Sequence, residues 1–235
     1  MYEGKKQARD QHMAQTGIQV FRDLTISSDQ IALSEVRLSL LGVEAQNWVH
    51  NEGQEANLKD HAVGIRQEDV LVFDYAGDTL PKATLTLWQR DNAYTVTNIV
   101  PAEVGELGVK LYNDLLVCFL DEVVEQADAR EQLALQLTDD IRGLDTWTSA
   151  EAADALRRFS ALANKSTTNS HPNDRERWEQ FVIEAHRNGD NLPVDILMQW
   201  LVEVDGWDET SANKLAIEFE QGISLLGAYD ANLRG

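Results

Sequence analysis

The residues best suited to chemistry lie where two predicted helices meet in the C-terminal half of the chain. There a lysine, two serines, a histidine and two arginines fall close together: Lys165, Ser166, Ser170, His171, Arg175 and Arg177. A helix N-terminus offers free amide groups and a positive partial charge, so it favours phosphate or carboxylate. The sequence therefore predicts a candidate anion-binding site in the helix-loop-helix 157–187.

A plainer interpretation of the same residues stays open beside this one. The hydroxyl groups and His171 can cap helices, and the arginines can pair with surrounding acids. Because Arg175 and Arg177 are two positions apart on a helix, at most one of them is expected to share a site with His171. His171 and Asp174 could form a base and its orienting acid, or only a cap and a first-turn acid.

Signatures of other chemistry are missing from the sequence. It holds no phosphate-binding G-x-x-x-x-G-K-[ST] loop, no G-x-G-x-x-G, no G-x-S-x-G and no H-E-x-x-H. Cys118 is the single cysteine, and the five histidines show no ligand spacing, so neither a metal nor a cofactor is expected. Asp69 and Asp74 flank a predicted strand, but a magnesium site there lacks a matching lysine, and surface acids explain them as well. Whether the chain is an enzyme stays undecided, with the balance against catalysis.

The C-terminal half reads as a series of helices. Thr148 to Glu151 fits a capping box, which predicts a helix starting near Ser149. Pro172 opens the next helix, with Ser170 or His171 as its cap, and Gly189 ends it. Further helices are predicted after Pro193 and after a cap at Asp208. The apolar stripe of the last one is either core or a homo-oligomer face through 209–227, and the tail 230–235 is expected to be loose.

The N-terminal half mixes strands and helices. The clearest strands are 70–73, 83–89 and 94–100, which predict an antiparallel meander. Shorter strand signals occupy 18–26 and 133–137. The pattern in 28–41 fits a helix or a strand, and the helix is favoured. A long helix is predicted in 109–126 with Leu111 facing inward, and a loop that can include a helical turn is predicted in 51–60.

These patterns predict an α+β fold: an N-terminal antiparallel sheet region with packed helices, followed by a C-terminal all-α helical subdomain. The expected division is a polar N-terminal arm at 1–16, an α+β domain at 17–145 and a helical subdomain at 146–235, with the boundary near Asp145.

The charge narrows the class of partner. The chain carries 40 Asp and Glu against 20 Lys and Arg, a net charge of −20 with pI near 4.5. Direct nucleic-acid binding is not expected, because that affinity comes from neutralising phosphates. With no membrane-spanning run and no leader pattern, a cytoplasmic protein is expected. The leading hypothesis is a non-catalytic protein, such as a bacterial immunity or antitoxin protein or an accessory subunit, that binds a basic-surfaced protein partner. The alternative is an enzyme or sensor that binds a phosphorylated small molecule or nucleotide at 157–187.

Overall fold

The computed structural model describes residues 17–61, 69–103, 105–165 and 171–234. It divides into two compact parts: a sheet unit, Gln19–Asp140, and a helical unit that includes Ile18 and the chain from Ile141 onward. The division falls a few residues before the boundary predicted near Asp145. Two short strands, β1 (Ile18–Gln19) and β8 (Ile141–Arg142), pair where the chain enters and leaves the sheet unit.

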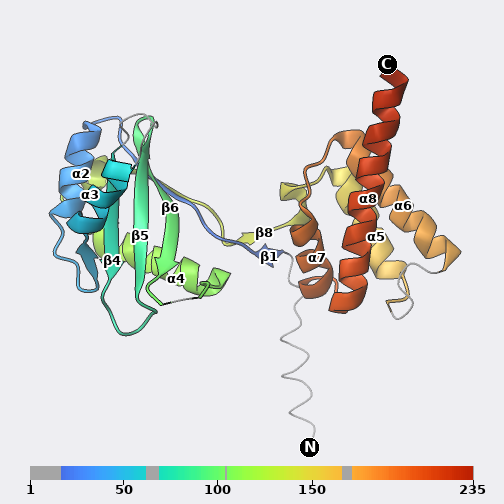
Figure 1. Cartoon of the computed structure of the whole chain (residues 1–235), viewed down its shortest axis with the longest axis horizontal. Coiled ribbons are helices and arrows are strands. Elements are labelled where there is room, and N and C mark those ends of the chain that lie inside the picture. Colours follow the sequence, from blue (N-terminus) through green and yellow to red (C-terminus); the bar gives the residue numbers. More distant parts are fainter. Residues whose placement is uncertain (1–16, 62–68, 104, 166–170, 235) are drawn as a thin grey trace, which may run out of the picture. The chain divides into compact units, whose positions relative to one another are not determined.

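The sheet unit is built on a six-stranded antiparallel sheet with the order β3-β4-β5-β6-β2-β7 (Figure 1). Its strands are β3 (Trp48–His50), β4 (Val70–Tyr75), β5 (Ala83–Arg90), β6 (Ala93–Pro101), β2 (Leu24–Ser27) and β7 (Ala134–Leu137). The predicted meander is confirmed as β4, β5 and β6. Asp91, at φ 52°, makes the tight β5–β6 turn, a left-handed conformation that aspartate tolerates better than most residues. The predicted strand at 133–137 is confirmed as the edge strand β7.

One face of the sheet carries the core. Alternate side chains of a strand point to opposite faces, so Leu85 and Leu87 of β5 are buried while Thr84, Thr86 and Trp88 lie on the other face. The core face is covered by α2 (Leu33–Leu41), α4 (Val109–Phe119) and the π-helical turn η1 (Leu120–Val124). In this core the ring of Phe119 packs 5.3 Å from that of Trp48.

Three local predictions for this unit need correction. Residues 51–60, predicted as a loop, form the helix α3 (Glu52–His61), beside β4 in Figure 1. Its start is fixed by Asn51, whose Oδ1 accepts a hydrogen bond from the amide of Gln54 at 2.8 Å. The helix at 109–126 stops being α-helical at Phe119, and Leu111 is exposed rather than inward. The strand signal at 18–26 splits into β1 and β2.

The helical unit contains α5 (Ala150–Leu162), α6 (Pro172–Asn188), α7 (Val194–Glu203) and α8 (Glu209–Arg234). Short 3-10 turns, η2 (Arg130–Gln132) in the sheet unit and η3 (Leu144–Thr146) here, join longer elements. Together with the antiparallel sheet, these helices confirm the predicted α+β class. The rings of Phe159 and Trp207 stack 5.4 Å apart in the helical core, and those of Phe181 and Phe219 stack 5.3 Å apart.

The helix caps were predicted with mixed success. Gly189 at φ 68° ends α6, and Asp208 Oδ1 accepts from the amide of Ser211, both as predicted. The cap of α5 is Ser149 rather than Thr148, because Ser149 accepts from Ala152 N–H while the Thr148 hydroxyl donates to Leu144 O. His171, one of two predicted caps, caps α6.

The last helix is longer than predicted, since α8 continues to Arg234 through the segment expected to be loose. Its predicted apolar stripe is buried from Ala212 to Phe219. Beyond that point α8 projects past the other helices of this unit (Figure 1), and Leu225 is 71% exposed. None of the helices that the structure describes combines the length and apolar content needed to cross a membrane.

Candidate functional site

The structure separates the predicted anion-site residues. Lys165 Nζ donates to the backbone oxygen of Asp205 and lies 6.0 Å from the ring centroid of Trp207. His171 Nδ1 accepts a hydrogen bond from the amide of Asn173 at 3.3 Å, the contact of a helix cap. Ser166 and Ser170 lie outside the described residues.

The two arginines line different grooves. Arg177 lies with His171 and Asp174 along a groove of about 570 Å³, whereas Arg175 lines another, of about 690 Å³, between α6 and α8. Arg175 Nε donates to Glu179 Oε1 at 2.9 Å, and Arg177 Nη1 donates to Asp174 Oδ1 at 2.8 Å. Lys165, Arg175 and Arg177 therefore already bond to protein oxygens.

Asp174 makes the His171 groove a poor receptor for an anion. Asp174 is only 5% exposed. Its carboxylate accepts hydrogen bonds from Arg177 at 2.8 Å and from the backbone amide of Asn164 at 3.3 Å. An anion bound there would face this carboxylate and compete for the same arginine. The anion site stays a prediction, and the contacts favour capping and ion pairing.

A second polar cluster of the helical unit joins the loop after α5 to the α7–α8 turn. Trp207 Nε1 donates to Ser160 Oγ at 2.8 Å in the buried core, next to the Lys165 contact with Asp205. Burial raises the pKa of the Asp205 carboxyl above its ordinary value, although the Ser160 hydroxyl and the charge of Lys165 oppose the rise. This cluster fixes the turn at Gly206, where φ is 70°.

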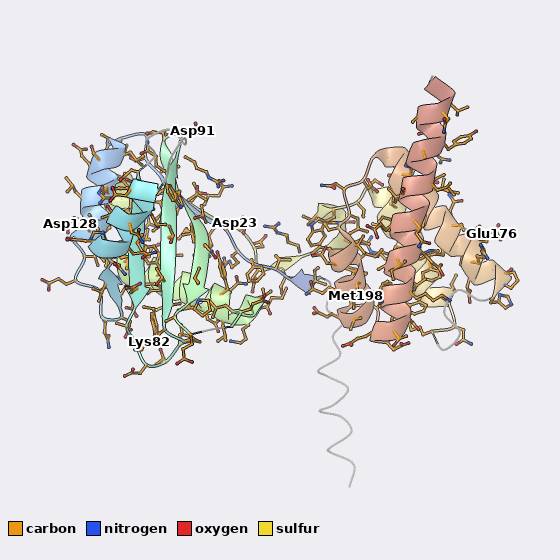
Figure 2. The ribbon with its side chains drawn as sticks, in the orientation of Figure 1. Asp23, Lys82, Asp91, Asp128, Glu176 and Met198 are labelled. Carbon is orange, nitrogen blue, oxygen red and sulfur yellow. The ribbon has the colours of Figure 1, made fainter. Side chains whose placement is uncertain are left out.

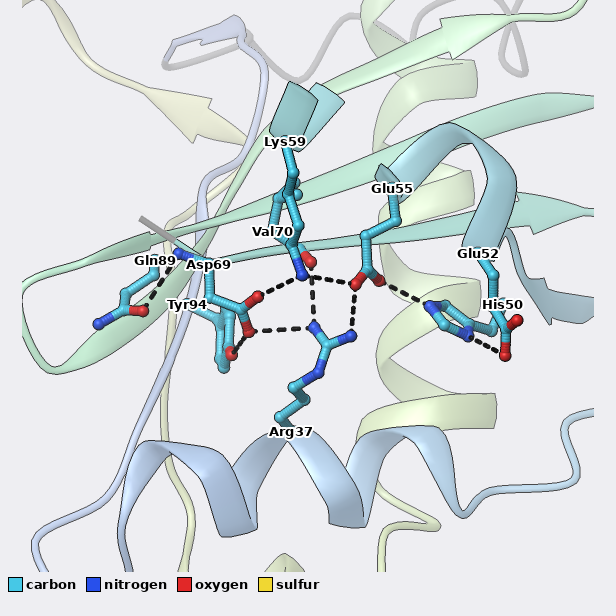
Figure 3. A network of polar contacts seen from close by, with 9 residues as sticks. All are labelled: Arg37, His50, Glu52, Glu55, Lys59, Asp69, Val70, Gln89 and Tyr94. Carbon is cyan, nitrogen blue, oxygen red and sulfur yellow. Dashed lines mark hydrogen bonds and ion pairs between the residues drawn. The ribbon is translucent and has the colours of Figure 1, made fainter. Parts of the chain in front are cut away.

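A network of charged groups lies in the sheet unit (Figure 3), and of its members the sequence patterns had singled out only Asp69. It gathers side chains from α2, the end of β3, α3, the residue before β4, and β6. They are Arg37, His50, Glu55, Lys59, Asp69 and Tyr94. Glu55 is central, with a side chain 8% exposed. Arg37 Nη2 and Lys59 Nζ both donate to its Oε1, the latter at 2.8 Å, and His50 Nε2 lies 2.7 Å from its Oε2.

Asp69 is the second acidic centre of the network. It accepts from Arg37 at 3.0 Å, lies 2.7 Å from Lys59 Nζ and accepts from the Tyr94 hydroxyl at 2.5 Å. Arg37 also donates to the backbone oxygen of Val70 at 3.0 Å, so it ties α2 to the first residue of β4.

The pKa values in the network follow from these contacts. Burial alone would raise the pKa of Glu55, but hydrogen bonds from Lys59, His50 and Arg37 outweigh it, and the pKa lies below its usual value. Asp69 shows the same balance, with Lys59 and Tyr94 as the main donors lowering its pKa. Burial, and then the contact with Asp69, raise the pKa of the Tyr94 hydroxyl. The acids are therefore charged and the phenol neutral at pH 7.

The network is balanced in charge and saturated in contacts. Two cations, Arg37 and Lys59, face two carboxylates, Glu55 and Asp69, and every one of these groups bonds to another. Such a cluster fixes the packing of α2 and α3 against β4 instead of presenting an unused charge to a ligand. These residues, which run from Arg37 to Tyr94, come together only in the tertiary fold, so no local sequence motif predicts the network.

Asp69 and Asp74, the two acids that flank a predicted strand, do not share a site. Asp69 belongs to the network, whereas Asp74 accepts hydrogen bonds from the side-chain amide (Nδ2) of Asn51 and from the Thr84 hydroxyl, both at 2.6 Å. Across the described ranges, no group of three or more His, Cys, Asp or Glu side chains is placed to hold a metal ion.

The surface feature that remains is acidic and belongs mainly to the sheet unit. This unit has 22 Asp and Glu against 8 Lys and Arg, a net charge of −14. Within it the stretch 121–140 contains seven acids and a single basic residue, Arg130, which is already paired with Glu125 at 2.6 Å. Asp128, Glu131 and Asp139 are exposed, and Asp128 lies at the periphery of the unit in Figure 2. We call 121–140 the acidic segment.

Comparison with known proteins gave no match to a family model, to a curated protein or to a solved structure.

Proposed function

We propose that this chain is a non-catalytic, cytoplasmic protein that binds a protein partner with a basic surface through the acidic segment of its sheet unit. An immunity or antitoxin protein, or an accessory subunit of a bacterial assembly, has this mode of action. The observation that carries the proposal is the acidic segment, which has seven acids and one basic residue, Arg130, already paired with Glu125.

Physical reasons favour association over ligand capture. Exposed acids that lack cationic neighbours create a negative potential, which speeds encounter with a basic surface and excludes acidic proteins. The alternative, an enzyme or sensor that binds a phosphorylated small molecule or nucleotide, needs unpaired cations. Lys165, Arg175 and Arg177 instead donate to protein oxygens.

The test is capture of the partner by the tagged full-length chain in its native host, at about 0.05 M and about 0.5 M salt. A triple variant, Asp128→Asn with Glu131→Gln and Asp139→Asn, removes three charges from the acidic segment. The matched control removes three exposed acids from the helical unit, with Glu151, Glu176 and Glu220 each changed to Gln. Both variants change the net charge equally, so they separate local from overall electrostatics.

We expect a stoichiometric basic protein that binds the wild type and the control at low salt. Its binding should weaken at least about tenfold at high salt, because the Debye length falls, and similarly in the triple variant. Binding that ignores both salt and the triple variant would refute the electrostatic proposal. A small anion that co-purifies with the chain and is lost when Lys165 and Arg175 become alanine would favour the alternative.

A further inference from the structure

The strand β7 ends the sheet on the side of the acidic segment. In the described sheet it pairs with β2 and has no neighbour on its other side. Natural proteins usually protect such edges with lysine, proline or a bulge, because the free amide and carbonyl groups invite another strand. The four residues of β7, Ala134-Leu135-Gln136-Leu137, include no charge and no proline.

The register shows which backbone groups of β7 face outward. The amide of Thr138 donates to Asp23 O at 3.0 Å, so Thr138 faces β2. Hydrogen-bonded pairs alternate along an antiparallel ladder, which turns Gln136 toward β2 as well. The amide and carbonyl groups of Leu135 and Leu137 consequently point to the open side.

The side chains of the same two residues are only partly covered at the edge of the core. Leu135 and Leu137 pack against the core cluster but are only partly buried, whereas Leu133, just before the strand, is buried. A further strand would satisfy their outward backbone groups and would cover their side chains on the core face. Both needs are met by one extended segment with apolar residues at alternate positions.

The charges around β7 indicate which kind of segment can pair with its open edge. Exposed Asp128 and Glu131 precede the strand, and Asp139 and Asp140 follow it. A second copy of this chain, paired antiparallel through β7, would place the acids before one strand near the acids after the other. Like charges placed so close oppose that dimer. A segment with lysine or arginine at its ends is attracted at both.

We propose that the open edge of β7 receives an extended, basic segment of the partner protein as a seventh strand of the sheet. This inference rests on the proposed function and specifies how the partner is held. Backbone hydrogen bonds to Leu135 and Leu137 hold the segment in place, its apolar side chains lie over the core face, and its cations face the acids at the two ends of β7.

The test uses the full chain and a fluorescein-labelled peptide of alternating lysine and valine. In an antiparallel pairing, the peptide residues that donate to Leu135 and Leu137 lie directly opposite them and place their side chains on the same, core face. These residues are the valines. The control peptide carries N-methyl groups on its valine amides, which removes these donors and keeps the charge. A protein variant, Leu135→Pro, removes an outward amide of β7, and Leu135→Ala loses a comparable side-chain volume but keeps that amide.

Fluorescence anisotropy should show that N-methylation weakens binding about tenfold or more, and that Leu135→Pro weakens it similarly relative to Leu135→Ala. Hydrogen exchange at 134–138 should slow with the parent peptide only. Equal, salt-sensitive binding of the two peptides would overturn strand addition while leaving the acidic partner surface intact. If Leu135→Pro does not fold, the two peptides on the wild-type chain decide the matter. Failure of the parent peptide to bind at low salt also overturns strand addition, whereas the partner-capture experiment judges the proposed function independently.

Discussion

Removing the carboxylate of Glu55 is expected to destabilise the sheet unit more than any exposed charge change. Glu55→Ala leaves the partly buried guanidinium of Arg37 and the ammonium of Lys59 with one acidic partner, Asp69, and removes the carboxylate that His50 contacts at 2.7 Å. Breaking a fully buried ion pair costs about 3–5 kcal/mol. The Glu55 side chain is only 8% exposed, but those of Arg37 and Lys59 are 22% and 39% exposed, so water can solvate part of the freed charge. We therefore expect a loss of about 2–3 kcal/mol.

The matched control lies one turn earlier on the same helix. Glu52 has a side chain 89% exposed and approaches only His50, at 3.9 Å. Since alanine favours helices at both positions, Glu52→Ala should change the free energy of unfolding by less than about 0.5 kcal/mol.

The assay is urea unfolding of the full chain, combined with hydrogen exchange to assign each transition to a unit. A loss of 2–3 kcal/mol at an m-value of about 2 kcal/mol/M moves the midpoint of the sheet unit by roughly 1 M. Peptides from 33–41 and 52–59 should lose protection first, and those of α5 should not change. Equal midpoints for Glu55→Ala and Glu52→Ala would refute the structural role given to the network.

The pH dependence of the same variant gives an independent check. The pKa of Glu55 is lowered in the folded state, so its contribution is present above the unfolded-state pKa and is lost as pH falls through the folded value. The difference between wild type and Glu55→Ala should therefore be full at pH 7 and shrink below about pH 4. A difference that persisted unchanged at pH 2 would show that lost packing, and not lost charge, causes the effect.

Two further predictions concern the helical unit. Gly222→Ala should lower the melting temperature despite the better helix propensity of alanine, because the new Cβ would lie 2.7 Å from Val182 Cγ1. The expected net loss in the free energy of unfolding is about 1 kcal/mol. Gly227→Ala on the same helix meets nothing within 4 Å and should stabilise by about 0.5–1 kcal/mol; the same sign for both would contradict the close packing of α6 and α8. Asp205→Asn should stabilise the unit at pH 7 by up to about 1 kcal/mol, because burial raises the pKa of Asp205 and its charged form opposes folding. This gain should vanish as pH falls and the wild-type carboxyl takes up a proton, and thermal unfolding at pH 7 and pH 4 would reveal a gain that instead grew.

The sequence by itself determined the features that depend on neighbouring residues. Alternation predicted the strands of the meander, three- and four-residue spacing predicted α5 to α8, and Gly189 and Asp208 ended or began helices as expected. Net charge, which needs no fold at all, identified the acidic character of the chain.

The tertiary structure decided what depends on residues far apart in the chain. The helix α3 has no apolar stripe that predicts it, and it is fixed by the contact of Glu55 with Arg37 on α2 and that of Lys59 with Asp69, just before β4. Lys165 and Arg175, which the sequence analysis grouped in one site, bond to different partners, because side chains on a loop and on a helix point in directions that sequence spacing does not set. The open edge of β7 likewise follows only from the strand order. Periodicity records whether a side chain is buried, whereas the partner of a polar group is set by the path of the whole chain.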